Sequence, residues 1–145
     1  MPIANYTTTV DALKTVGEIQ GILVGHGARS ILINYAKDKT IESLSFIVET
    51  RHGDIPFRLP VDANAVLKVL EEQGVPPRYA NYQQAVRIAW RIVKDWVRAQ
   101  MALLETEMVQ MEQIFLPYMV AKGDKTLYET MADKGFYLEE GKPER

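Results

Sequence analysis

Residues 82–100 read YQQAVRIAWRIVKDWVRAQ, and this stretch decides the predicted fold. Its basic residues are Arg87, Arg91, Lys94 and Arg98, which are four, three and four positions apart. At about 100° per helical residue, this spacing places all four on one side of a helix. The opposite side is apolar and carries Ala85, Val86, Ile88, Ala89, Ile92, Val93, Trp96 and Val97. The pattern therefore predicts an amphipathic helix with one buried face and one basic face.

Length and composition limit what the rest of the chain can be. The 145 residues, 47% hydrophobic and 25% charged, are typical of one globular domain. The absence of cysteine excludes disulfides and sulfur ligands. No apolar run is long enough to cross a membrane, and the N-terminus has no secretory pattern, so we expect a cytoplasmic protein that does not enter membranes. The net charge of -2 disfavours binding nucleic acid by bulk charge but leaves room for a local basic surface.

The residues before this helix predict a strand, a helix and a meander. Residues 6–10 (YTTTV) are β-branched and aromatic, as in a short strand. Thr15 and Glu18 form a T-x-x-E capping box that marks the start of a helix. Three strands follow, at residues 30–36, 41–50 and 55–59, and they are separated by polar turns short enough for antiparallel pairing. Pro56 lacks an amide hydrogen and so places the third strand at an edge.

Two further helical patterns complete the chain. Asp62 is expected to cap a helix over residues 63–73, and Asn81 with Gln84 is expected to start the long helix as an N-x-x-Q variant of the capping box. The long helix is expected to run on to about residue 116, because an apolar seam continues with spacings of four, three, four, three and four. The seam consists of Val97, Met101, Leu104, Met108, Met111 and Phe115. A helix of that length would extend about 50 Å, beyond a domain of this size, which favours self-association, whereas packing against the domain's own helices is the alternative.

The predicted fold class is α+β, with an antiparallel meander of three to four strands, helices on one face and a long C-terminal helix. Residues 1–121 are expected to form one domain that includes the long helix at 82–116. Residues 122–145 are expected to hold a short helix near 125–133, capped by Asp124, and a loose C-terminal arm.

Motifs for catalysis are missing from the sequence. It has no phosphate-binding glycine loop, nucleophile elbow or metal-ligand pattern, so we expect no cofactor, no metal and no enzyme activity. His26 is expected to be a partly buried or capping residue at a helix end. His52 and Asp54 are an imaginable acid/base pair, but residues two apart in a turn seldom point at one target.

The basic face has two interpretations. It is either an ordinary solvated face or a set of phosphate contacts, and cations elsewhere favour the second. These are Arg29, Lys37, Lys39, Arg51, Arg58 and Arg78. The leading hypothesis is therefore a non-enzymatic, oligomeric protein that binds single-stranded nucleic acid. The alternative is a small regulator that binds a host protein through the seam at residues 97–115.

Several stretches give the chain a family likeness. With TVGEIQGILVGHGARSI, PFRLPV, VPPRY, AWRIVKDWVRAQMALLETEM and FLPYM, the chain resembles small uncharacterised proteins of bacterial phage and mobile-element gene clusters. The meander at 30–59 followed by the basic helix at 82–100 also resembles, in topology, single-strand annealing proteins of the Erf and Red-beta kind. That resemblance implies DNA binding along a groove between sheet and helix, and assembly into rings or filaments. The helix at 63–73 departs from that topology.

Overall fold

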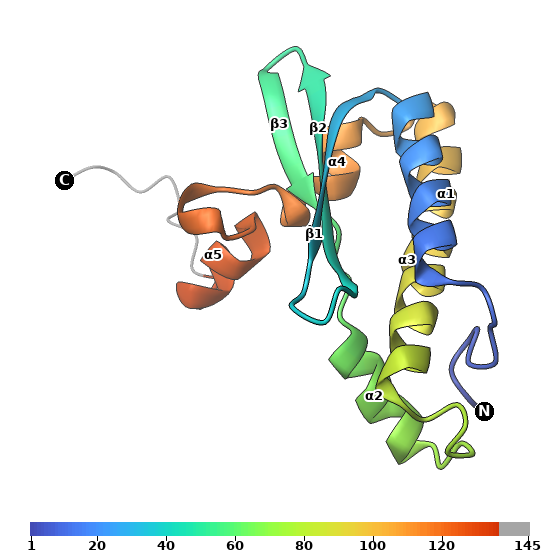
Figure 1. Cartoon of the computed structure of the whole chain (residues 1–145). Helices are drawn as coiled ribbons and strands as arrows, with labels where there is room; N and C mark the ends of the chain where they lie inside the picture. Colours follow the sequence, from blue (N-terminus) through green and yellow to red (C-terminus); the bar gives the residue numbers. More distant parts are fainter. Residues whose placement is uncertain (137–145) are drawn as a thin grey trace.

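A computed structural model describes residues 1–136 of the chain and confirms the α+β class (Figure 1). The strands are β1 (Ala28–Tyr35), β2 (Ile41–Thr50) and β3 (Gly53–Arg58), and they form an antiparallel sheet in the order β1-β2-β3. The helices are α1 (Ala12–Gly25), α2 (Ala63–Glu72), α3 (Tyr82–Glu105), α4 (Met111–Phe115) and α5 (Leu127–Asp133), with 3-10 turns η1 (Leu116–Tyr118) and η2 (Lys122–Asp124). The predicted meander is thus confirmed with three strands, whereas a full fourth strand is not.

The sheet buries one face because apolar residues alternate along its strands. Leu44, Phe46 and Val48 of β2 are buried, as their alternation predicts, and Phe57 of β3 lies beside Phe46 with ring centroids 5.4 Å apart. The tight turn into β3 depends on Gly53, whose φ of 100° suits glycine. β3 is an edge strand, as Pro56 predicts.

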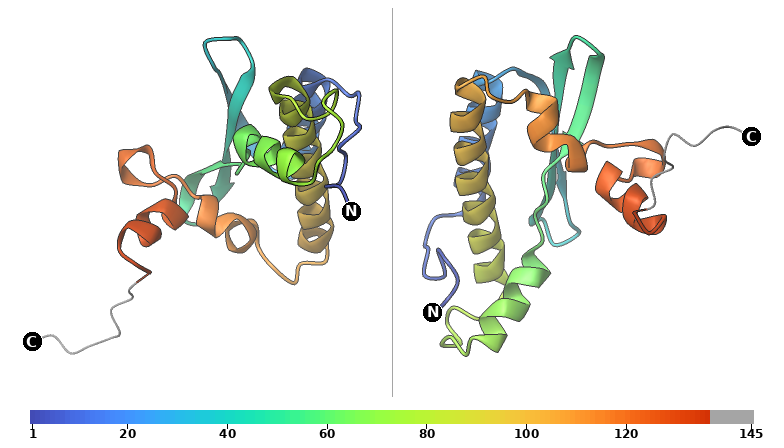
Figure 2. Two further views of the ribbon diagram at one scale, coloured as in Figure 1. Left: turned by 90° about the horizontal axis from the view of Figure 1, so that it is seen from below. Right: turned by 180° about the vertical axis from the view of Figure 1, so that it is seen from behind.

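Helices α1 and α3 run parallel on one side of the sheet, while α5 lies on the other side (Figures 1 and 2). The prediction that the helices share one face therefore holds only for part of them. α3 begins at Asn81, whose side chain accepts a hydrogen bond from the Gln84 amide at 2.9 Å, as predicted. α2 begins at the predicted cap Asp62 and packs against α3 in a second apolar cluster with Leu70 at its centre.

Two predictions for the N-terminal part are wrong. Residues 6–10 form turns and loop rather than a strand, because the side chain of Gln84 supplies donors to the carbonyls of Tyr6 and Thr8 at 3.0 and 2.8 Å. α1 begins after Asp11, not at Thr15. Thr15 is buried within the helix and donates its hydroxyl to the Asp11 carbonyl, so its side chain caps nothing.

The predicted continuous helix to residue 116 is also wrong. α3 ends at Glu105, and Glu107 has a φ of 64°, which an α-helix cannot accommodate. A capping box between Gln110 and Gln113 starts α4, which returns to the sheet. The reason is the burial of Phe115, whose ring packs edge-on against Phe46 at 5.4 Å.

The C-terminal segment fastens to β3. Met119 forms an isolated bridge with Phe57, and the Val120 amide donates to the Pro56 carbonyl at 2.9 Å. The expected short helix is present as α5, which Thr126 rather than Asp124 caps. Of the predicted C-terminal arm, residues 137–145 lie outside the described residues.

Candidate interaction surface

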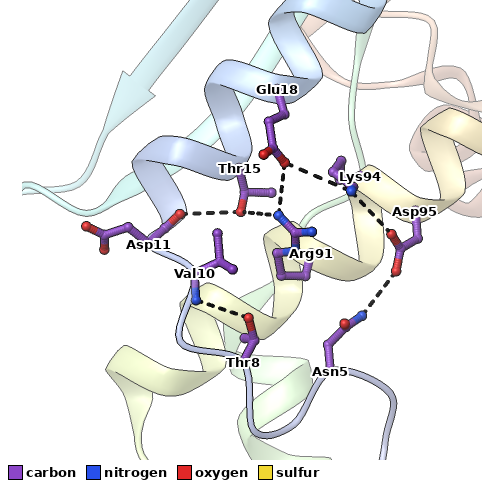
Figure 3. Close-up of polar contacts among 9 residues, drawn as sticks. All are labelled: Asn5, Thr8, Val10, Asp11, Thr15, Glu18, Arg91, Lys94 and Asp95. Carbon is purple, nitrogen blue, oxygen red and sulfur yellow. Dashed lines mark hydrogen bonds and ion pairs between the residues drawn. The ribbon is translucent and has the colours of Figure 1, made fainter.

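The middle of the basic face of α3, at Arg91 and Lys94, lies against α1 (Figure 3). Glu18 of α1 lies 2.9 Å from Arg91 NH1 and 3.9 Å from Lys94 Nζ. The Lys94 side chain is only 7% exposed, and its Nζ is also 3.7 Å from Asp95 Oδ1. One carboxylate from α1 therefore neutralises the middle of the predicted basic stripe, because a buried cation is stable only when it is paired.

This arrangement is a polar network that holds α1 against α3. Arg91 NH1 also donates to the Thr15 hydroxyl at 3.2 Å, and Asn5 Nδ2 donates to Asp95 at 3.2 Å (Figure 3). The first contact joins α3 to α1, and the second joins α3 to the N-terminal loop. The spacing of the cations therefore reflects the packing of α3 against α1. The sequence of α3 alone cannot distinguish this role from phosphate binding.

The other predicted cations are dispersed over several elements. Arg87 donates to Gln84 at 3.1 Å, Arg29 pairs with Asp54 at 3.5 Å, Arg58 pairs with Asp124 at 2.7 Å, and Arg78 lies 4.8 Å above the Tyr79 ring. Arg98 and Arg51 are exposed and form no ion pair among the described residues. Most of the cations predicted to bind nucleic acid therefore have partners within the protein itself.

The predicted seam lies mostly inside the domain. Its members Val97, Met101, Met111 and Phe115 are buried in the main core, Leu104 packs against that core, and Met108 is exposed. The heptad spacing therefore arises from two separate helices, α3 and α4, which both face the core. As a surface for a partner, the set of six is unavailable in this fold.

The two histidines lie in different settings. His26 Nδ1 is 2.9 Å from the Ile22 carbonyl oxygen and its Nε2 is 3.0 Å from Glu105, so both ring nitrogens face acceptors. The Ile22 carbonyl first, and then Glu105, raise the pKa of His26 above its ordinary value. His52 is exposed, and the Asp54 carboxylate turns to Arg29, so their proposed acid/base pairing is not seen. Within residues 1–136, no three potential metal ligands gather.

The outer edge of β1 is open in the described part of the chain. In the described part of the chain β1 pairs with β2 alone, so alternate peptide groups along β1 have no strand partner. Its central residues, 30–34 (SILIN), carry no charge and no proline, and bulges lie only at the two ends of this segment. Leu32 on this strand is 59% exposed. Edge strands that avoid pairing usually contain such protective residues, and this segment lacks them.

The neighbouring face of α1 is also apolar and open. Leu13, Gly17, Gly21 and Val24 fall within one narrow stripe of the helix. Leu13 is 66% exposed and Val24 is 58% exposed. Charged residues in α1 are limited to Lys14 and Glu18, and Glu18 is turned towards α3. A solvated helix face normally carries more charge, so this face has the composition of a surface that packs against something.

Two recesses border α1 and β1. A shallow one of ≈ 490 Å³ is lined by Gln20, Gly21, Val24, Arg29, Ser30 and Ile31. The other, of ≈ 280 Å³, lies where the start of α1 meets the β1–β2 turn, and its lining includes Leu13, Tyr35 and Ile41. Together with the edge of β1 and the apolar stripe of α1, they define what we call the α1–β1 surface.

Comparisons with family models, curated proteins and solved structures found no match. Among the described residues, none of the helices combines the length and apolar character needed to span a membrane. The case for function therefore rests on the α1–β1 surface itself. The sequence did contain its signals, namely a helix with two charges in fourteen residues and an uncharged, proline-free strand core.

Proposed function

We propose that this protein is a non-enzymatic protein-interaction module that binds an extended chain segment along β1. The observation that carries the proposal is the outer edge of β1, which lies beside an apolar helix face and pairs with no strand within residues 1–136. In strand addition, main-chain hydrogen bonds supply affinity and pockets for alternate side chains supply selectivity. The predicted protein-interaction class is kept, and its site moves from the seam at residues 97–115 to the α1–β1 surface.

The chemistry of this surface favours a polypeptide as the ligand. Residues 30–34 offer backbone donors and acceptors with no charge, and Leu13, Val24 and Leu32 offer exposed apolar contacts. A phosphate-binding surface would instead need several cations directed at one strand. Arg29 directly precedes this segment in the sequence, and it pairs with Asp54.

The proposal can be tested with a fluorescent eight-residue peptide of alternating valine and threonine, flanked by lysines for solubility. Fluorescence anisotropy should detect binding, and Leu32→Lys should weaken it at least about tenfold, because an edge lysine opposes strand addition. The matched control is Leu116→Lys, which changes an exposed leucine of η1 on the β3 side of the molecule. Absence of binding, or equal weakening by both changes, would overturn the proposal.

Binding of single-stranded nucleic acid is the second candidate, in keeping with the resemblance to phage annealing proteins. It is favoured by exposed cations that form no ion pair among the described residues, and Lys37, Lys39, Arg51 and Arg98 are four of them. Anisotropy with labelled single-stranded DNA at low salt tests it. Arg51→Glu and Arg98→Glu should each weaken binding and reduce its salt dependence. Binding that responds to neither change would rule this candidate out.

A further inference from the structure

We infer that the segment added to β1 is the β1 strand of a second copy of this chain. The two copies would form a two-fold dimer in which the two sheets join edge to edge. This inference rests on the proposed strand-addition function and names its partner. It also places self-association at the α1–β1 surface, where the exposed apolar residues lie, and not at the buried seam.

Residues 30–34 of β1 are self-complementary. An antiparallel pair centred on Leu32 sets Ser30 opposite Asn34 of the second copy and Ile31 opposite Ile33. Polar residues then meet polar residues, apolar residues meet apolar ones, and no like charges face each other. A random partner segment has no reason to match this order, whereas a second copy matches it by symmetry.

Both faces of the new strand pair would also be satisfied. On one face, Asn34 Nδ2 already donates to Ser43 Oγ at 3.2 Å across β1 and β2, which shows how amide and hydroxyl pair there. Leu32 points to this face and would cover its own copy across the axis. On the other face, Ile31 and Ile33 are only partly buried against the core, so their counterparts would complete that burial.

Helix α1 supports the same pairing. Adjacent strands lie about 4.8 Å apart and packed helices about 8–10 Å apart, so joining two β1 strands would bring the two α1 helices together above them. Their facing stripes contain Leu13 and Val24 near the ends and Gly17 and Gly21 in between. A Cβ built on either glycine meets nothing within 4 Å, so a second helix backbone can approach closely there. The antiparallel arrangement would set Leu13 of one copy near Val24 of the other.

The interface would be of modest size. It combines a strand of 8 residues with the outer face of a helix of 14 residues. Stable interfaces use about 20–30 residues on each side, so this one lies at the lower end. We therefore expect a dimer whose dissociation constant is on the order of micromolar, and its population should change on dilution.

Sedimentation velocity over a dilution series tests the inference with full-length chains of 16.5 kDa. The wild type should approach twice the chain mass at high concentration. Leu32→Lys and Leu32→Glu should each weaken the dimer at least about tenfold, because like charges would meet at the two-fold axis. An equimolar mixture of the two variants should dimerise again. Only a contact between position 32 and itself predicts this recovery.

Several outcomes separate this inference from the function on which it rests. A wild type that stays monomeric while binding the valine–threonine peptide would overturn the dimer and leave the module intact. A dimer unaffected by Leu32→Lys, or variants that fail to recover on mixing, would overturn the β1 pairing. Thermal unfolding of both variants beside Leu116→Lys checks that the fold is retained, and Val24→Glu on α1 gives a second variant that should also weaken the dimer.

Discussion

The two edges of the sheet differ in how the chain treats them. The β3 edge contains Pro56, which cannot donate to a neighbour, and the returning C-terminal segment covers it through the Val120 amide. The β1 edge has no proline or charge in its central segment, and no strand in the described part of the chain pairs with it. One edge is protected twice, and the other is exposed beside an apolar helix.

This difference indicates that the chain covers one edge of its sheet, β3, and leaves the other, β1, open in the described residues. Sheets commonly protect their edges, because an open edge pairs with other chains. The same chain has the means to close an edge, since it sends residues 111–120 back to β3 and fastens Arg58 to Asp124. An open β1 edge is therefore consistent with a binding role.

The largest expected effect comes from removing the anchor of the covered edge. Phe115 is fully buried and contacts the rings of Phe46, Phe57 and Trp96. Phe115→Ala should lower the free energy of unfolding by about 3–5 kcal/mol, since it leaves a cavity in the core. It should also loosen residues 116–120 and so speed hydrogen exchange at the Val120 amide.

The control for this change is the next residue, Leu116, which is 45% exposed. Leu116→Ala should cost less than about 1 kcal/mol, because little apolar surface leaves the core. Equal losses in chemical denaturation for the two variants would contradict the role of Phe115 as the anchor of this edge.

The second prediction concerns the support for α1 beside the open edge. Glu18→Gln removes the charge that pairs with Arg91 and Lys94. We expect a loss of about 1–2 kcal/mol in unfolding free energy, because Arg91 would lose its carboxylate partner and the buried Lys94 would lose one of the two carboxylates near it. Urea denaturation measures this loss. Glu72→Gln at the exposed end of α2 is the control.

The same network allows a sharper test. Adding Lys94→Met should recover part of the loss caused by Glu18→Gln, because the long apolar side chain can occupy the site without needing a counter-charge. If the double variant is less stable than Glu18→Gln alone, the buried cation is not the source of the cost.

Local patterns predicted local structure well. The alternation in residues 41–50, the cap at Asn81 and the cap at Asp62 all appear as expected, because each depends on neighbouring backbone groups. The first strand and the Thr15 cap were wrong, because Gln84 and the polar network draw those residues into contacts with α3. At these positions, contacts with α3 determined the local structure, and the intrinsic strand and capping preferences of the residues did not.

The candidate sites show the same limit. A cationic stripe has one sequence pattern whether it meets phosphate or a carboxylate from another helix, and Glu18 is 73 residues from Arg91 in the chain. The methionine seam likewise has one spacing whether its helix continues or breaks at Glu107. The α1–β1 surface could have been inferred from the missing charges, but only the fold shows that α1 and the open strand edge are neighbours.

The smallest expected effect concerns His26, which ties the end of α1 to the end of α3 just before β1 begins. Its pKa is raised in the folded state, so protonation stabilises the fold. That contribution is fully present below the unfolded pKa of about 6.5 and is lost as the pH rises through the higher folded pKa. The loss should stay under about 1 kcal/mol, because Glu105 is exposed and the charge at the helix end is screened.

Chemical denaturation at a series of pH values between slightly acidic and slightly alkaline conditions measures this slope. His26→Gln should flatten the fall in unfolding free energy over that window. A slope that survives His26→Gln would assign the titration to another group.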